Sequence, residues 1–145
     1  MGNLMATQKL ENHVVVCGYG VVGQKVVEVL EDHGVPFIII EYSPSVVDRI
    51  KELNYNVILG DATSSKTLRV AGIADAKAIA VVMDNDAKNI FTILTARDLN
   101  KSVFIATRAN DERIREKFIE AGADYIVTPQ KSASDEIIGE LKRKQ

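Results

Sequence analysis

Apolar runs and amphipathic stretches alternate along the chain from residue 13 to its end. The runs are short and rich in β-branched residues, which is typical of strands buried on both faces of a parallel sheet. Between the runs, apolar residues recur at helical spacing, as Val22, Val26, Val29 and Leu30 do within residues 21–33. The pattern therefore predicts strands and helices in regular alternation.

Six strands are predicted, at residues 13–17, 37–40, 56–59, 78–83, 103–107 and 125–128. The first helix covers residues 21–33, and four others are predicted to start at the N-caps Ser43, Thr63, Asp84 and Asn110 and to run to about residues 53, 72, 99 and 122. A last amphipathic helix covers residues 132–144. Strands separated by helices indicate βαβ units with right-handed crossovers. The predicted fold is α/β: a single domain with a Rossmann-like, doubly wound parallel sheet of six strands.

Composition narrows the classes of function. The 145 residues include 18 Lys and Arg against 20 Asp and Glu, a net charge of −2 without a basic stripe, which disfavours nucleic acid as a partner. No apolar run reaches the length of about 18 residues that a membrane span needs. The first twelve residues lack the apolar core of a signal peptide. A single cysteine, Cys17, excludes an internal disulfide and indicates a soluble domain in a reducing compartment.

A glycine-rich loop follows the first strand and opens the first helix. It reads Gly18-Tyr19-Gly20-Val21-Val22-Gly23, the pattern G-x-G-x-x-G in the context that binds a pyrophosphate. Gly18 permits the tight turn, Gly20 lets a phosphate approach the backbone, and Gly23 lets the helix pack closely on the strand. The anion would rest on free N–H groups at the positive helix end. The alternative is a plain strand-to-helix turn.

Two further segments favour an adenine nucleotide. Glu41 follows the second strand, 18 positions after Gly23 and close to the spacing of about 20 at which an acidic residue meets the ribose. Its carboxylate would accept from both ribose hydroxyls and repel a 2′-phosphate, which favours NAD, ADP or ATP over NADP. Gly60-Asp61-Ala62-Thr63 ends the third strand, where adenine would lie. The alternatives are a solvated strand end for Glu41, and a turn with a helix cap for the second segment.

Catalytic and metal sites have little support, and none is predicted. His13 and His33 are interpreted as structural, and Cys17 as an inert buried thiol. Two acidic pairs at helix starts are interpreted as capping residues rather than metal ligands: Asp84 with Asp86, and Asp111 with Glu112. No Ser-x-x-x-Lys or Tyr-x-x-x-Lys motif stands where hydride transfer would need an acid. A small NAD-dependent oxidoreductase remains the enzymatic alternative.

Several segments together resemble one family. They are Asn12 to Gly20 (NHVVVCGYG), Gly60 to Thr63 (GDAT), Asp86 with Asn89, Ala121 to Asp124 (AGAD) and Val127 to Pro129 (VTP). In these segments the chain resembles a regulator-of-potassium-conductance domain, also called an RCK, TrkA-N or KTN domain. The resemblance covers about residues 12–144. The strand that begins with histidine is most similar to domains attached to prokaryotic potassium channels.

The resemblance implies a regulatory role without catalysis. Such domains bind NAD(H) or AMP, ADP or ATP, and pair into homodimers that assemble into a gating ring of up to eight copies. They open or close a potassium channel or transporter pore at the cytoplasmic face of the membrane. On this basis residues 12–129 are the nucleotide-binding domain, residues 1–11 a lead-in and residues 130–145 a crossover helix. A regulator of a cation antiporter is the remaining alternative.

The resemblance also implies which residues form the site. The loop from Gly18 to Gly23 (Gly18, Tyr19, Gly20, Val21, Val22 and Gly23) would hold phosphate, and Glu41 the ribose. Gly60, Asp61, Ala62 and Thr63 would lie near the adenosine, and Asp86, Asn89 and Arg108 toward the far end of the nucleotide.

Two positions depart from the family pattern. Many relatives carry arginine where Val21 stands, so Lys25 or Arg108 would have to neutralise the phosphates. Calcium-gated relatives place acids after the fifth strand, where this chain has Thr107-Arg108-Ala109-Asn110, which disfavours calcium gating through that position.

The predicted helices at 84–99 and 110–121 carry more large apolar residues than one sheet face needs: Ile90, Phe91, Leu94, Ile114 and Phe118. We expect part of this surface to be a dimer interface. The alternative is that all five residues face the sheet.

Overall fold

A computed structural model describes residues 10–144, so most of the expected lead-in, residues 1–11, lies outside the described residues. The predicted α/β fold is confirmed: one sheet of six parallel strands in the order β3-β2-β1-β4-β5-β6. The strands are β1 (Val14–Cys17), β2 (Phe37–Glu41), β3 (Val57–Leu59), β4 (Ala78–Val81), β5 (Phe104–Arg108) and β6 (Tyr125–Val127). Their bounds agree with the predicted ones to within two residues.

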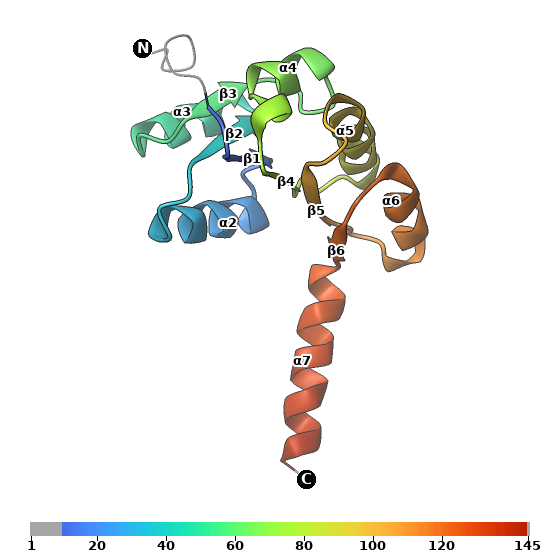
Figure 1. Cartoon of the computed structure of the whole chain (residues 1–145). Helices are drawn as coiled ribbons and strands as arrows, with labels where there is room; N and C mark the ends of the chain where they lie inside the picture. Colours follow the sequence, from blue (N-terminus) through green and yellow to red (C-terminus); the bar gives the residue numbers. More distant parts are fainter. Residues whose placement is uncertain (1–9, 145) are drawn as a thin grey trace.

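Helices cover both faces of the sheet, as a doubly wound fold requires (Figure 1). On one face lie α2 (Val21–Asp32) and α3 (Pro44–Glu52), and on the other α4 (Ser65–Val70), α5 (Asp86–Leu99) and α6 (Arg115–Ala121). Two apolar cores result. Val27 of α2 and Ile50 of α3 pack against β1 and β2, while Leu68, Ile93 and Phe118 of the other helices fill the opposite face.

The strand order reverses its direction between β1 and β4. From β1 the chain builds β2 and β3 outward on one side of β1, and then crosses back through α4 to place β4 on the other side. Loops from the carboxyl ends of β1 and β4 therefore part in opposite directions and leave a crevice between them. Parallel pairing in register, with Cys17 beside both Ile40 and Val81, brings the ends of all three strands to one level. This crevice is where a ligand site is expected.

Three predicted N-caps are wrong by one residue. Ser64, Asn85 and Asp111 cap the helices or 3₁₀ turns that were assigned to Thr63, Asp84 and Asn110. Two of the residues proposed as caps have other partners: Thr63 donates to Asp61, and Asn110 bonds with Arg108 and Asp86. The predicted cap Ser43 is confirmed, with Pro44 at the first helical position. The helix expected after residue 110 is a short 3₁₀ turn, Glu112–Ile114, followed by α6.

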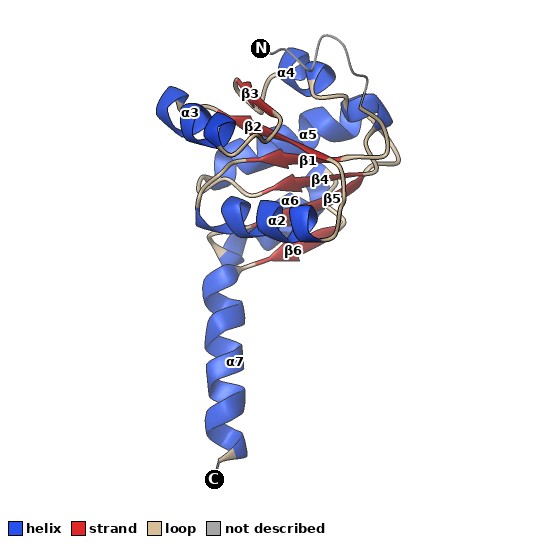
Figure 2. Ribbon diagram, turned by 90° about the vertical axis from the view of Figure 1, so that its left-hand side faces the viewer, coloured by secondary structure: helices blue, strands red, loops and turns tan. Residues whose placement is uncertain are grey.

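The last helix, α7 (Pro129–Arg143), begins three residues earlier than predicted and projects away from the sheet (Figure 2). It contains no buried residue, and its apolar stripe of Ile137, Ile138 and Leu141 is exposed. None of the helices within residues 10–144 is long and apolar enough to cross a membrane. The predicted division between a domain ending at residue 129 and a crossover helix stays a prediction.

Candidate functional site

A cavity of about 540 Å³ occupies the crevice at the carboxyl ends of the strands. Nine of the fourteen predicted site residues line it: Gly18, Tyr19, Gly20, Val21, Glu41, Gly60, Asp61, Ala62 and Arg108. The other five do not: Val22, Gly23, Thr63, Asp86 and Asn89. The fold thus brings together the carboxyl ends of β1 to β5 and the first turns of α2, α3 and α5, although Gly18 and Arg108 are 90 residues apart in the chain.

The structure requires glycine at two of the three loop positions, and the third glycine borders the cavity. Gly18 has φ +103°, a left-handed conformation, and a Cβ there would lie 2.9 Å from Met83 Cγ. A Cβ on Gly23 would lie 2.0 Å from the carbonyl oxygen of Gly18, so only glycine lets α2 start this close to β1. A Cβ on Gly20 would meet nothing within 4 Å, because this residue borders the open cavity.

The start of α2 is suited to an anion. Gly20 is the N-cap residue and provides no side-chain acceptor, and the first turn of the helix carries no acidic residue. Its first N–H groups therefore remain available to a negatively charged ligand, which the helix dipole also favours. This arrangement supports the predicted phosphate position.

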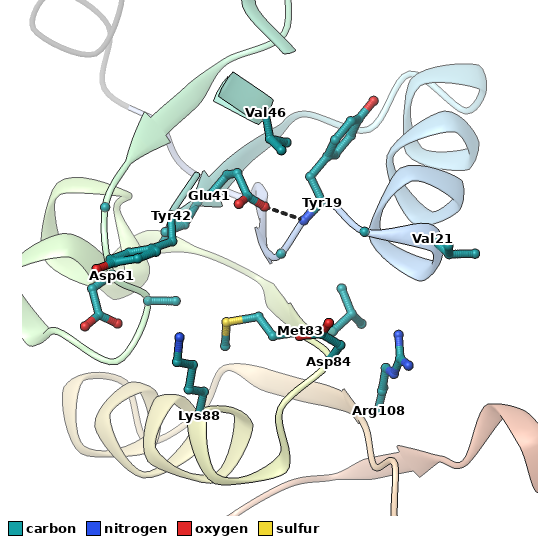
Figure 3. A pocket seen from close by; sticks show the side chains of 16 residues that line it. Tyr19, Val21, Glu41, Tyr42, Val46, Asp61, Met83, Asp84, Lys88 and Arg108 are labelled. Carbon is teal, nitrogen blue, oxygen red and sulfur yellow. Dashed lines mark hydrogen bonds between the residues drawn. The ribbon is translucent and has the colours of Figure 1, made fainter. Parts of the chain in front are cut away.

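Glu41 is held rigidly at the edge of the cavity (Figure 3). Its Oε1 accepts a hydrogen bond from the backbone N–H of Tyr19, and its Oε2 accepts one from the backbone N–H of Ser43, both at 2.9 Å. Each carboxylate oxygen can accept from more than one donor. Glu41 therefore anchors the glycine loop to β2 and can still accept from ligand hydroxyls.

Asp61 carries a fixed negative charge at the side of the cavity nearest β3. Its Oδ1 accepts from the backbone N–H of Thr63 at 2.9 Å and from the Thr63 hydroxyl at 2.7 Å. These hydrogen bonds, helped by the nearby ammonium of Lys88, lower the pKa of Asp61 below its usual value. Thr63 shapes the site through Asp61 and does not itself line the cavity.

The Asn89 side chain links the segment after β4 to the end of β5 by hydrogen bonds. The side chain is fully buried on α5, and its Nδ2 donates to the carbonyl oxygens of Met83 at 2.9 Å and Arg108 at 3.1 Å. Its Oδ1 accepts from the backbone N–H of Met83 at 3.1 Å. Asn89 thereby positions two residues that do line the cavity, and its predicted contact with a nucleotide stays a prediction.

The Asp86 side chain likewise bonds to the backbone, in this case to the loop that follows β5. Its carboxylate accepts from the backbone N–H groups of Asn110 at 2.7 Å and Asp111 at 3.0 Å, and from the Asn110 side-chain amide at 3.2 Å. The Asn110 amide oxygen in turn accepts from Arg108 Nε at 2.9 Å. The Asp86 side chain thus holds the loop that sets the position of Arg108, and its direct contact with a ligand also stays a prediction.

Seven cavity residues were not predicted: Ile40, Tyr42, Val46, Val82, Met83, Asp84 and Lys88. Lys88 supplies a second cation in addition to Arg108 and lies over the ring of Tyr42. Lys25, the other predicted phosphate partner, forms an ion pair with Glu28 at 3.3 Å on the exposed surface of α2 and does not line the cavity. Strand-end position was the signal that could have found Tyr42, Met83 and Asp84.

The histidines and the cysteine occupy structural positions. His13 is fully buried and donates from Nε2 to the carbonyl oxygen of Ala71 at 2.8 Å, and His33 donates from Nδ1 to that of Val29 at 2.8 Å. Burial raises the pKa of the Cys17 thiol to about 12, so the thiolate nucleophile is not formed near neutral pH. Within residues 10–144 no group of three or more His, Cys, Asp or Glu side chains could hold a metal ion.

The strand order, the glycine loop and the crevice define a doubly wound domain of the Rossmann type. The TrkA-N domain family matches residues 14–129, and the chain belongs to this family. It is 37% identical over 124 residues to Potassium channel protein 1 of Methanocaldococcus jannaschii, covering 84% of this chain and 37% of that protein. The chain thus spans only about a third of the length of that curated relative.

Solved structures show the same likeness. The TrkA-N domain of the inner membrane protein ybaL from Escherichia coli aligns with a TM-score of 0.88 and 25% identity, over 92% of this chain and 99% of that one. The GsuK RCK domain aligns at 0.77 with 33% identity, over 93% of this chain and 29% of that one. The AMP-bound Kef C-terminal domain of Shewanella denitrificans aligns at 0.77 with 27% identity, over 90% and 80%.

Proposed function

We propose that this chain is a ligand-sensing regulatory domain that binds an adenine nucleotide or NAD(H) in the β1–β4 crevice and gates a potassium channel or transporter. The observation that carries the proposal is the Glu41 carboxylate, anchored beside the glycine loop and the free start of α2. Membership of the TrkA-N family and the likeness to a potassium channel protein and to an AMP-bound domain support it. The proposed role is regulatory rather than catalytic, in line with the likeness to a potassium channel protein.

The charges in the cavity favour ligands with few phosphates. Two cations, Lys88 and Arg108, face three carboxylates, Glu41, Asp61 and Asp84. NAD(H), AMP and ADP therefore fit this balance better than ATP, whose larger negative charge meets no additional cation. The Glu41 carboxylate also disfavours the 2′-phosphate of NADP.

Thermal stability tests this proposal directly. Melting temperatures would be measured with NAD, NADH, AMP, ADP and ATP at equal millimolar concentration, with NADP as the control ligand. A ligand at about 100 times its dissociation constant adds about 2.7 kcal/mol to the free energy of unfolding, a shift of several degrees for a domain of this size. We expect such a shift with at least one ligand and a smaller one with NADP. No shift with any of them would contradict nucleotide sensing.

We also propose that the domain forms a homodimer through α5. Of the five apolar residues expected to contribute, Phe118 is fully buried and Ile90 and Ile114 pack against the core. Phe91 and Leu94 point outward, with 61% and 47% of their surface exposed. Two large apolar side chains on one helix face fit a self-complementary contact.

Sedimentation measures this association. The wild-type domain at high micromolar concentration is expected to sediment as a dimer, and the variant Phe91→Lys as a monomer that keeps the circular dichroism spectrum of the folded domain, because the side chain is exposed. Val29→Lys, on the exposed surface of α2, is the matched control and should remain dimeric. A monomeric wild type, with and without nucleotide, would contradict the interface.

The pore that this domain regulates is also a proposal. We place the domain in the cytoplasm at the inner membrane face, as dimers within a ring beneath a potassium channel. The likeness to a potassium channel protein supports a channel as the partner. The likeness to a Kef C-terminal domain and to Putative K(+) efflux antiporter KefB of Alkalimonas amylolytica favours an antiporter as the second candidate. Potassium flux in vesicles that contain the whole protein separates the two, since a channel conducts passively whereas an antiporter requires an opposing ion gradient.

A further inference from the structure

Tyr42 and Lys88 meet across the crevice. Tyr42 directly follows Glu41 at the end of β2, whereas Lys88 lies in the first turn of α5, beyond the end of β4. The Lys88 ammonium nitrogen lies 5.2 Å from the centroid of the Tyr42 ring, within the range of a cation–π contact, and both side chains line the cavity (Figure 3). The pair therefore joins the two halves of the doubly wound sheet at the site itself.

The spacing leaves no room for a base between them. Carbon atoms in contact lie about 3.5–4.0 Å apart, so a flat base placed between a ring and an ammonium group needs a separation of about 7 Å. At 5.2 Å the Lys88 ammonium occupies the position on the ring that a stacked base would take. Tyr42 is otherwise well placed for stacking, since its side chain is 69% exposed and stands between Glu41 and Asp61.

We propose that Tyr42 is the residue on which the base of the bound nucleotide stacks, and that Lys88 covers its ring until the base displaces it. This inference rests on the proposed nucleotide binding and adds to it the two residues that recognise the base. Once displaced, Lys88 remains beside Asp61, whose pKa its charge already helps to lower, so its ammonium keeps an anionic neighbour.

The relative strengths of the two contacts favour displacement of Lys88 from the Tyr42 ring by the base. An exposed cation–π contact changes an equilibrium constant by about two- to fivefold, whereas stacking of a base on an aromatic side chain contributes about five- to a hundredfold. A base therefore gains more from the Tyr42 ring than Lys88 loses. Substituting Tyr42 is therefore expected to weaken binding of the base, whereas substituting Lys88 is expected to strengthen it. Both substitutions abolish the same contact between the two side chains.

The experiment measures dissociation constants by titration for AMP, adenosine and ribose 5-phosphate. Tyr42→Leu is expected to weaken AMP about tenfold and to leave ribose 5-phosphate, which has no base, unchanged. Tyr42→Phe, which keeps the ring, should retain wild-type affinity. Lys88→Met is expected to bind adenosine two- to fivefold more tightly, because the competing ammonium is gone and adenosine carries no phosphate. Tyr125→Leu, an exposed tyrosine of β6 outside the cavity, is the matched control.

Two results would contradict the proposed roles of Tyr42 and Lys88, one for each substitution. If Tyr42→Leu binds AMP as the wild type does, or loses AMP and ribose 5-phosphate equally, the base does not stack on Tyr42. If Lys88→Met binds adenosine more weakly, Lys88 is a ligand contact and not a cover. Either result overturns this inference while nucleotide binding by the wild type stands. A wild type that binds neither AMP nor NAD overturns the proposed function and this inference with it.

Discussion

Replacing Gly23 with alanine is expected to remove much of the stability of the domain. The added Cβ would lie 2.0 Å from the carbonyl oxygen of Gly18 and 2.9 Å from its carbonyl carbon, and both atoms belong to the backbone. No side-chain rotation relieves that overlap, so α2 has to move away from β1. Overpacking costs about 1–3 kcal/mol, more where the backbone must shift, against a total of about 5–15 kcal/mol. The shift would also open the contact of Val27 with the sheet.

Urea denaturation followed by circular dichroism measures the loss. The matched control is Gly139→Ala in α7, where the added Cβ meets nothing within 4 Å and the substitution removes a glycine from a helix interior. That variant should be as stable as the wild type or slightly more so. A free energy of unfolding for Gly23→Ala within about 0.5 kcal/mol of wild type would show that the loop accommodates a side chain and that close packing is not the reason for this glycine.

The fold was predictable because its signals are local. Strands buried on both faces must be apolar at nearly every position, as at Val14–Cys17, and the amphipathic stretches between them can only be the crossover helices. Helix caps were predictable only to within one residue. A run such as Asp61-Ala62-Thr63-Ser64 contains several side chains able to accept from a free N–H. Which of them caps depends on the turn made by the others, and here Asp61 engages Thr63 and leaves Ser64 as the cap.

The candidate site was predictable where backbone geometry dictates the residue type. Gly18 and Gly23 are required by a left-handed conformation and by a close approach, respectively, and such requirements leave a recognisable spacing. Asp86 and Asn89, which were predicted to lie toward the far end of the nucleotide, bond to backbone groups and do not line the cavity. A polar side chain near a strand end looks the same in sequence whether it faces the ligand or the wall. Lys88 was not predicted as a site residue, because its place in the cavity depends on how α5 packs on the sheet and not on a sequence motif.

Replacing Glu41 with alanine is expected to weaken AMP binding by about ten- to a hundredfold. Hydrogen bonds to a charged acceptor contribute about 1.5–3 kcal/mol, and a change of 1.4 kcal/mol corresponds to a factor of ten in affinity. The substitution also frees the backbone N–H groups of Tyr19 and Ser43, so the glycine loop loses its tie to β2. Titration calorimetry gives the affinity, and Glu28→Ala, an exposed carboxylate of α2 outside the cavity, is the matched control with unchanged affinity.

A second ligand separates the two roles of Glu41. The wild-type domain is expected to bind 2′,3′-dideoxy-AMP more weakly than AMP, because that ligand lacks both hydroxyls that the carboxylate would accept from. In Glu41→Ala the difference between the two ligands should disappear, while any loss shared by both reports the loosened loop. If the variant still prefers AMP by the wild-type ratio, the ribose is held by another group, and Glu41 acts only through its hydrogen bonds to Tyr19 and Ser43. A ratio near one in the variant assigns the ribose to Glu41.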